Sequence, residues 1–297
     1  MSPKGVDVEI GGRHLTLSNL EKVLWPETGF TKSQMIDYYA RVASVMVPHL
    51  VGRPVTLRRF PNGVVGGSFF EKNCPSHKPA WLPTVKMSDT TYCRIEEQAA
   101  LVWTANLAAI ELHPNLAVAS DLARPSFMVF DLDPGPGADV LTCGRVAFML
   151  RDRLDSLSLT SFVKTSGSKG LQLYVPLNSK ATYDETRAFS LGLAQVLEKA
   201  HPDLVVTTQE KSVRPNKVLI DWSQNSSFKT TIAVYSLRAR PRPTASTPIT
   251  WSELESAVGD GDSSRLVFEA GEALERVERL GDLMAPVLSV QQSLPQL

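Results

Sequence analysis

The stretch VFDLDPGPGA, residues 129–138, constrains the fold more than any other part of this chain. The residues before it are β-branched and aromatic, as in a buried strand, and the PGPG that follows can continue neither a strand nor a helix. Side chains alternate between the two faces of a strand, so Asp131 and Asp133 point to the same side. The sequence therefore predicts a strand that ends with two like charges on one face, an arrangement that costs free energy unless a cation lies between them.

A pair of divalent cations would explain these charges. Mg²⁺ and Mn²⁺ take carboxylate oxygens and leave positions for phosphate oxygens. Asp221, late in the apolar run KVLIDWSQN, is a third candidate ligand, and three carboxylates from two strands can hold two ions about 3.5–4 Å apart for phosphoryl transfer. The alternatives are that Asp131 and Asp133 are helix caps or a solvated strand end, and that Asp221 caps a turn with Ser223. For Asp221 taken alone, the cap is the better interpretation.

Composition narrows the class of protein. The 297 residues are 43% hydrophobic, enough for a large core, and 31 basic residues balance 31 acidic ones. This balance argues mildly against a nucleic-acid binder but leaves room for a local basic groove. Cys74, Cys93 and Cys143 lack C-x-x-C spacing, so we expect reduced thiols rather than a disulfide framework or zinc site. We find no signal peptide and no membrane-spanning apolar run, and we expect a cytoplasmic protein without a membrane partner.

The order of periodic segments indicates a mixed α/β fold with strands that pair locally. Capping boxes at Thr31/Gln34 and Thr182/Glu185, and a cap at Asp139, predict three helices. A further helix is expected through AALVWTANLAAIEL, and the tail from Trp251 is mostly helical. Strands are expected in VDVEIGGRHLTLS (as a pair), RPVTLRRF, SFFEKN, YCRIEE, SFVKTS, LQLYVPL, VVTTQEK, KVLIDWS and TTIAVYSLRAR.

Two segments suggest phosphate binding. KTSGSKG, residues 164–170, can present successive backbone N–H groups to an anion, with Ser166 and Lys169 as side-chain donors, although it lacks P-loop spacing. In SLRARPR, Arg238 and Arg240 lie two apart on one face of an expected strand end, and guanidinium forks match phosphate oxygens. The alternatives are an ordinary hairpin turn and a solvated basic strand.

Other candidates are weaker when taken alone. Phe69 and Phe70 are adjacent in a strand, so we expect one to be core and the other exposed for base stacking. Lys22 and Lys32 flank WPETGF at a helix start, which suits a phosphate, although two solvated lysines are the simpler alternative. His113 in LHPN is more typical of packing, and Arg214 precedes the KVLID strand.

The motifs together are more specific than any one of them. NLEKVLWPETGFTK, SFFEKN, FDLDPG, KTSGSKGL, VLIDWSQN and YSLRARP occur in the order seen in bacterial ligase D polymerase domains. From about residue 8 to about residue 285 the sequence resembles that branch of the archaeo-eukaryotic primase superfamily. The resemblance implies a catalytic core of mostly antiparallel β-sheets flanked by helices. It also implies an enzyme that extends or fills DNA ends in non-homologous end joining, using nucleoside triphosphates, often ribonucleotides, with two Mn²⁺ or Mg²⁺ ions.

The resemblance also assigns roles to residues. It implies DNA with a 5′-phosphate end or gap as the substrate, a DNA ligase and end-binding repair proteins as partners, and a place beside the bacterial nucleoid. Asp131, Asp133 and Asp221 would carry the metals. The nucleotide would be bound by His113, Ser166, Lys169, Gln172, Arg214, Gln224, Arg238 and Arg240, and the DNA by Lys22, Lys32, Phe69 and Phe70.

The chain departs from the family pattern at two places. Gln172 stands where the family commonly has His after KTSGSKGL, and a glutamine cannot carry charge to a triphosphate. The tryptophan usual near His113 is absent from PNLA. We expect a single primase-polymerase domain over residues 1–297, or an amino-terminal module 1–90 packed on a catalytic module 91–297 with a seam near residues 74–91. The chain holds no ligase or nuclease motif, so it is either a stand-alone polymerase or an excised domain, and we expect the stand-alone polymerase.

Two rival functions remain. A haloacid-dehalogenase-type phosphatase also has a strand ending in D-x-D, but it leaves LIDWSQN and SLRARP without a role. A non-catalytic module that binds and bridges DNA ends gains support from Gln172.

Overall fold

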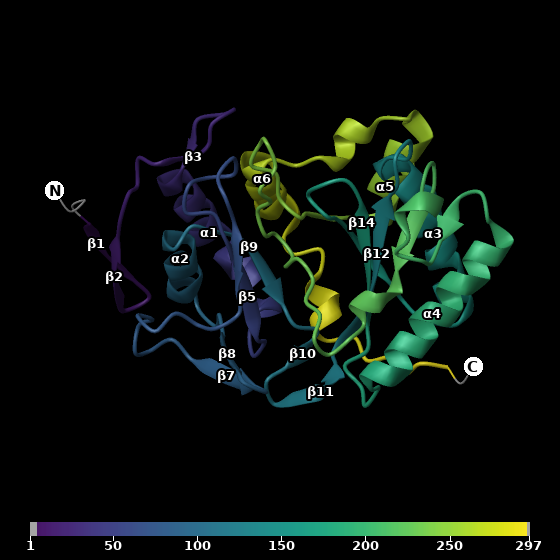
Figure 1. Cartoon of the computed structure of the whole chain (residues 1–297), viewed down its shortest axis with the longest axis horizontal. Helices are drawn as coiled ribbons and strands as arrows, with labels where there is room; N and C mark the ends of the chain where they lie inside the picture. The colour runs from purple at the N-terminus through teal and green to yellow at the C-terminus, as the bar shows by residue number, and fades with distance from the viewer. Residues whose placement is uncertain (1–4, 296–297) are drawn as a thin grey trace. The chain divides into compact units, whose positions relative to one another are not determined.

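The computed structural model describes residues 5–295 and divides the chain into two compact units, each built from segments distant in sequence (Figure 1). The first unit runs up to residue 115 and includes 232–245 and 269–281. The second comprises 116–231, 246–268 and the chain from 282 onward. Residues 74–91, where the sequence suggests a seam, lie inside the first unit. The interpretation of the whole chain as one primase-polymerase domain stays a prediction.

The first unit is organised around β5, which pairs antiparallel with β6, β8 and β9. Helix α1 packs against α2 and α6. The capping box of Thr31 and Gln34 begins α1 as predicted, and the buried Tyr39 donates its hydroxyl to the carbonyl of Ile110 on β9 at 2.6 Å. The elements are β1 (Val6–Ile10), β2 (Arg13–Leu17), β3 (Val23–Trp25), β4 (Phe30–Thr31), α1 (Lys32–Met46), η1 (Val47–His49), β5 (Val55–Arg59), β6 (Phe69–Glu71), β7 (Thr84–Met87), β8 (Thr90–Cys93), α2 (Gln98–Asn106), β9 (Ala109–Pro114) and α6 (Ala270–Leu280).

Two sequence predictions in this unit are wrong. The helix expected through residue 112 ends at Asn106, because Ala108 adopts a left-handed conformation (φ 58°) and turns the chain into β9. The segment TTIAVYSLRAR is not a strand. Tyr235 also has a positive φ (64°), and the backbone N–H of Leu237 donates to the hydroxyl of Tyr39 rather than to a sheet. Its β-branched residues are buried without forming a strand. A prediction from β-propensity cannot distinguish these two cases, because the propensity itself largely reflects burial.

The expectation of three reduced thiols is wrong for two of them. Cys74 and Cys93 form a disulfide in the first unit, and Cys143 is a free, buried thiol. Cys93 ends β8, and the N–H of Cys74 donates to the carbonyl of Thr91 at 2.6 Å, which brings the two Cα atoms to 4.9 Å. A separation of 19 residues matches no short motif, so the sequence carries no signal for this pairing.

The second unit is built on a sheet with strand order β15-β16-β12-β14-β13-β17, antiparallel throughout except for β15 with β16. Capping boxes at Asp139 and Thr182 begin α3 and α4, as predicted. The elements are β10 (Ala117–Val118), β11 (Asp121–Pro125), β12 (Phe127–Pro134), α3 (Val140–Ser156), β13 (Phe162–Thr165), β14 (Leu171–Pro176), α4 (Tyr183–Ala200), β15 (Val205–Val206), η2 (Lys211–Val213), β16 (Val218–Asp221), η3 (Trp222–Gln224), β17 (Pro248–Ile249), α5 (Trp251–Asp260), η4 (Ser263–Leu266) and η5 (Ala285–Leu288).

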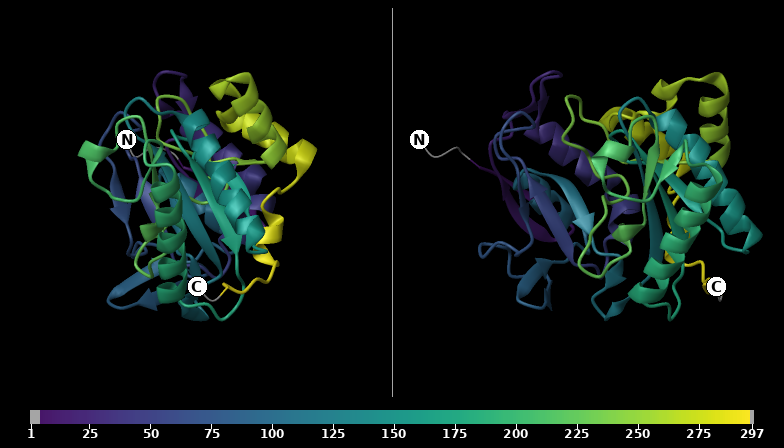
Figure 2. Two further views of the ribbon diagram at one scale, coloured as in Figure 1. Left: turned by 90° about the vertical axis from the view of Figure 1, so that its right-hand side faces the viewer. Right: turned by 45° about the vertical axis from the view of Figure 1, so that its right-hand side comes forward.

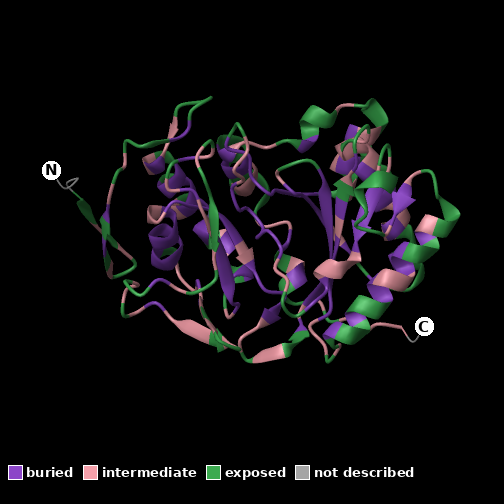
Figure 3. Ribbon diagram, viewed as in Figure 1, coloured by how far each residue is buried: buried purple, intermediate pink, exposed green. Residues whose placement is uncertain are grey.

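The two faces of this sheet differ in character. Phe130 and Leu132 of β12 point into a core shared with α3, α4 and α5, and Figure 2 shows α3 and α4 beside the strands they cover. Figure 3 shows the central strands buried and the outer sides of these helices exposed. Because side chains alternate along β12, Asp131 and Asp133 lie on the face opposite this core. Mostly antiparallel sheets flanked by helices confirm the predicted mixed α/β class. None of the helices within residues 5–295 has the length and apolarity needed to cross a membrane.

Candidate active site

Strand register brings the predicted carboxylates together in the second unit. Asp131 of β12 lies directly opposite Asp221 of β16, and Asp133 lies opposite Leu219. Directly opposed residues of an antiparallel pair share a face, with Cβ atoms about 4.5–5.5 Å apart. Asp131, Asp133 and Asp221 therefore lie on one face of the sheet, although 88 residues of sequence separate Asp133 from Asp221.

Asp221 is also engaged as a cap. Its Oδ1 accepts from the N–H and hydroxyl of Ser223 at 3.0 and 2.5 Å, and its Oδ2 accepts from Nε2 of Gln224 at 3.0 Å. Among the described residues, no group of three or more His, Cys, Asp or Glu side chains lies close enough together to hold a metal ion. The metal-ligand role of the three aspartates stays a prediction, and it requires Asp221 to share or release these contacts.

The electrostatics of the carboxylates fit a divalent cation. Burial raises the pKa of Asp131 to about 7, and the charges of Asp133 and Asp221 raise it as well, against the lowering effect of a hydrogen bond from Gln172. A carboxyl group that resists ionisation beside two like charges is one that a cation would stabilise as the anion. Carboxylate oxygens are also the donors that Mg²⁺ and Mn²⁺ prefer.

A polar row crosses the sheet at the level of Asp131. Gln172 of β14 pairs with Asp131 on one side and with Lys164 of β13 on the other. Lys164 is fully buried, donates to Oγ of Ser246 at 2.5 Å and lies 5.5 Å from the ring of Tyr174. Oε1 of Gln172 is buried without a hydrogen-bond partner. The sequence pattern gives no signal for Lys164, and only the strand register shows that it belongs to this row.

The turn 166–170 is closed by its own serine. Oγ of Ser166 accepts from the N–H groups of Ser168 (3.2 Å) and Gly170 (3.1 Å), so two amides expected to face an anion already have a partner. Lys169 is exposed at the tip of the turn.

Two glycines bring backbone segments close to the carboxylate strand. A Cβ on Gly135 would lie 1.9 Å from the carbonyl oxygen of Arg214, and one on Gly170 would lie 2.0 Å from that of Leu132. Side chains at either position would separate these segments. Gly135 thus allows Arg214, and Gly170 allows the 166–170 turn, to lie directly beside the end of this strand.

The first unit contains a second polar cluster, centred on Glu111 of β9. Its side chain is 2% exposed, and its Oε2 lies 3.2 Å from Nη1 of Arg58 and 3.1 Å from Nε2 of His113. Its Oε1 lies 3.4 Å from Nε of Arg238 and accepts from the N–H of Ala239 at 3.1 Å. The structure thus brings His113 and Arg238 together through a carboxylate for which the sequence carries no motif.

Burial sets the protonation of this cluster. Burial alone would raise the pKa of Glu111, but the hydrogen bond from His113 and the charge of Arg238 bring it down to about 2. Burial lowers the pKa of His113, against the opposing effect of Glu111. At neutral pH the glutamate is therefore an anion, and it faces Nε2 of His113.

Both adjacent phenylalanines are exposed, so the expectation that one of them is core is wrong. Phe69 and Phe70 are 45% and 57% exposed. Their strand β6 is short and lies at the edge of its sheet, and each ring is covered by an arginine of β5 instead of by apolar residues: Arg59 lies 5.4 Å from Phe69, and Arg58 lies 5.1 Å from Phe70.

The two lysines near the start of α1 lie close to each other. The N–H of Lys32 donates to the carbonyl of Lys22 at 2.8 Å, and Nζ of Lys32 donates to the carbonyl of Ser18 at 2.6 Å. Burial, together with the charges of Lys22 and Arg59, lowers the pKa of Lys32 to about 8. An ammonium short of counter-charge is a suitable partner for a phosphate. Arg240 follows Arg238 in the first unit, with its N–H donating to the Arg238 carbonyl at 2.9 Å.

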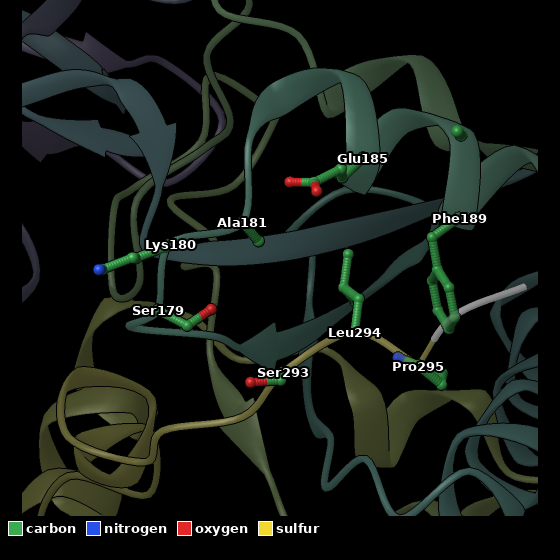
Figure 4. Close-up of a pocket in the computed structure, with 9 residues that line it drawn as sticks. Ser179, Lys180, Ala181, Glu185, Phe189, Ser293, Leu294 and Pro295 are labelled. Atoms are coloured by element: carbon green, nitrogen blue, oxygen red, sulfur yellow. The ribbon is translucent and has the colours of Figure 1, made fainter.

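A pocket of about 640 Å³ in the second unit holds none of the predicted site residues. It lies between the start of α4 and residues 293–295, and Figure 4 shows Lys180, Glu185, Phe189 and Leu294 among its lining side chains. Glu185 is committed there as the capping partner of Thr182.

Comparisons with known proteins agree with this arrangement of motifs. The family model for the primase-polymerase domain of LigD matches residues 31–284. The multifunctional non-homologous end joining protein LigD of Mycolicibacterium smegmatis is 44% identical over 277 residues, covering 91% of this chain and 36% of that protein. The bifunctional LigD of Bacillus subtilis is 33% identical over 269 residues, covering 90% of this chain and 43% of that protein. The chain thus spans less than half the length of these relatives.

A solved structure shows the same fold. The polymerase domain of Mycobacterium tuberculosis ligase D in complex with DNA superposes with a TM-score of 0.86 and 41% sequence identity, over 94% of this chain and 99% of that one. The family predicted from the motif order is confirmed: this chain belongs to the LigD primase-polymerase domain family, a family of polymerase-type nucleotidyltransferases.

Proposed function

We propose that this chain is a template-directed polymerase that adds nucleotides to primer 3′ ends at gaps or broken DNA ends, as in non-homologous end joining. The observation that supports this most directly is the pairing of Asp131 on β12 with Asp221 on β16, in a chain of this family. We further propose a preference for ribonucleotides, action in the bacterial cytoplasm beside the nucleoid, and cooperation with a DNA ligase and end-binding proteins.

Asp131, Asp133 and Asp221 would hold two Mn²⁺ or Mg²⁺ ions. Such ions, when bound, would acidify the primer 3′-hydroxyl and neutralise the charge of the triphosphate. The three carboxylates fix the place of nucleotide addition on one face of the sheet. Gln172 holds Asp131 by a hydrogen bond, and Ser223 and Gln224 hold Asp221, so these neighbours orient the carboxylates.

The residues that we propose to bind the nucleotide are His113, Ser166, Lys169, Gln172, Arg214, Gln224, Arg238 and Arg240. A lysine or arginine near the leaving pyrophosphate stabilises charge that develops as the α-phosphate bond breaks. Gln172 is neutral, so it contributes hydrogen bonding without charge.

Lys22 and Lys32 would bind the 5′-phosphate at the far side of a gap, and Phe69 and Phe70 would stack on template bases. A pocket for one terminal phosphate explains how a chain without net charge selects a broken end without coating a long duplex.

The deciding experiment is primer extension on a gapped, 5′-phosphorylated duplex with ribonucleotides or deoxyribonucleotides, under Mn²⁺ and under Mg²⁺. We expect a product one nucleotide longer and release of pyrophosphate, both lost in the Asp131→Ala, Asp133→Ala double variant. Release of phosphate from a small ester, without extension, would instead indicate the phosphatase.

A second candidate function is supported by the capped state of Asp221. If that carboxylate stays with Ser223 and Gln224, the chain is an end-binding module without catalysis. This candidate requires that the wild-type chain bind 5′-phosphorylated ends but add no nucleotide with Mn²⁺, and that the double variant bind equally well.

A further inference from the structure

Glu111 contacts residues that have different roles in the proposed function. Its Oε2 serves both Arg58 (3.2 Å) and His113 (3.1 Å), and its Oε1 serves Arg238 (3.4 Å) and the N–H of Ala239 (3.1 Å). The carboxylate is hydrogen-bonded to Arg58, His113 and the N–H of Ala239, and it forms an ion pair with Arg238. Movement of any one partner therefore changes the hydrogen bonding of the others.

Arg58 connects this carboxylate to the exposed ring of Phe70. Its guanidinium lies 5.1 Å from the Phe70 ring and 5.0 Å from the buried ring of Phe60, so it is held between two aromatic faces. Phe70 also meets His113 directly, edge to face, at 5.6 Å between ring centroids. The exposed ring thus reaches the Glu111 cluster by two routes, through Arg58 and through His113.

We propose that Glu111 is a positioning residue that couples the stacking of a template base on Phe70 to the binding of the nucleotide triphosphate at His113 and Arg238. This inference rests on the proposed function, because it takes Phe70 as the template platform and His113 and Arg238 as triphosphate ligands. It adds that the two binding events depend on each other, and it names the residue that links them.

The two binding events are coupled because one ligand orders the side chains that the other ligand contacts. More than half of the Phe70 side chain is exposed, so its ring keeps rotational freedom until a base stacks on it. A stacked base fixes the ring, and the ring contacts fix Arg58 and His113 against Glu111. The triphosphate then meets donors that are already ordered, so it loses less entropy on binding. Since coupling between two ligands is reciprocal, bound nucleotide must tighten template binding by the same factor.

The test measures the affinity of a triphosphate analogue with a methylene bridge between its α and β phosphorus atoms, which cannot be incorporated. Its Kd is determined by calorimetry without DNA and with a primer–template whose overhang offers the complementary base. The ratio of the two values is the coupling factor, and the same factor obtained from DNA binding with and without analogue is an internal check. For the wild type we expect a factor of at least about 5, within the usual range for coupled sites.

Glu111→Gln keeps the shape of the side chain but places an NH₂ group against donors. We expect the coupling factor to fall by at least about threefold, whereas base pairing contributes equally in both proteins. Arg58→Met keeps the apolar stem at a position that is one-third exposed, so it is the variant more tolerant of folding. It should lose the part of the coupling that runs through Arg58 but leave the DNA-free Kd within about twofold, since His113 and Arg238 keep their carboxylate.

Glu97→Gln is the matched control, because it removes the carboxylate of another arginine pair, with Arg13, in the same unit. A purely structural role for Glu111 would weaken both affinities together and leave their ratio unchanged. An unchanged ratio in Glu111→Gln and Arg58→Met, or a wild-type ratio near the value expected from base pairing alone, would overturn the inference. Failure of the wild type to bind the analogue at all would overturn the proposed function itself.

Discussion

Replacing Asp131 by Asn should stabilise the metal-free protein while removing nucleotide addition. In the folded chain Asp131 is buried near Asp133 and Asp221, and its pKa is raised from 3.8 to about 7. An amide of the same shape carries no charge and can still pair with Gln172. The charge of Asp131 thus lowers the stability of the metal-free protein, although metal binding needs that charge.

The magnitude follows from linkage between folding and protonation. One pKa unit corresponds to about 1.4 kcal/mol, so the rise from 3.8 to about 7 is worth about 4 kcal/mol. Part of this is shared with Asp133, and we expect a measured gain of about 2–4 kcal/mol. The folded chain holds its proton more tightly than the unfolded chain, so wild-type stability falls as the pH rises from about 4 to about 7 and is constant above that. The advantage of Asp131→Asn should therefore be small near pH 4 and full near pH 8.

Urea denaturation in the presence of a chelator measures this directly, at about pH 4.5 and at about pH 8. Millimolar Mn²⁺ should then stabilise the wild type at pH 8 much more than the variant, because the cation binds only the folded carboxylates. Leu219→Ala, an apolar change opposite Asp133, supplies a variant whose effect should not depend on pH. If Asp131→Asn is less stable than the wild type at pH 8, or gains equally at both pH values, the electrostatic account of this site is wrong.

Three further predictions concern the surroundings of the sites. Gly135→Ala places a Cβ 1.9 Å from the Arg214 carbonyl oxygen and should lower the free energy of unfolding, measured by urea denaturation, by at least about 2 kcal/mol. Gly67→Ala is the control, because open space surrounds Gly67 and the change should be neutral. Equal stability of the two variants would contradict this prediction. Cys74→Ser should lower stability by about 3 kcal/mol relative to the oxidised wild type, because it removes a disulfide that closes a loop with a 19-residue separation. A reducing agent should destabilise the wild type by the same amount and leave the variant unchanged. Lys32 loses its proton near pH 8, so the preference for binding a 5′-phosphorylated DNA end over a 5′-hydroxyl end should decline between about pH 7 and about pH 9. Binding assays should find no such preference in Lys32→Met, and a preference that stays constant with pH in the wild type would show that Lys32 does not bind the phosphate.

Local signals in the sequence predicted local structure well. Side chains within three residues decide a capping box, so the starts of α1, α3 and α4 could be read from Thr31, Asp139 and Thr182. The period of two along β12 placed Asp131 and Asp133 on one face. The end of α2 was missed because it depends on one left-handed residue, Ala108, and alanine gives no warning of a positive φ.

The contacts that build the sites depend on pairing between distant segments. The sequence suggested Asp221 as a ligand, but only register shows it opposite Asp131. Lys164 lies in a turn motif that drew attention to Ser166 and Lys169, yet its own buried place beside Gln172 follows from β13 pairing with β14. Glu111 sits in an apolar run that predicted a helix, and a correct strand assignment would have placed it on the same face as His113, two residues later.

The zero net charge of the chain says little about what it binds, because acidic and basic residues gather in separate clusters. Asp131, Asp133 and Asp221 place three acidic side chains on one face of the sheet, in the region where the buried Lys164 also lies. In the other, Arg58 and Arg238 exceed the single carboxylate Glu111, so that cluster is short of negative charge. Divalent cations suit the first cluster, and phosphate groups suit the second. Equal totals of acidic and basic residues are thus compatible with phosphate chemistry, and the informative quantity is the local excess around each buried charge.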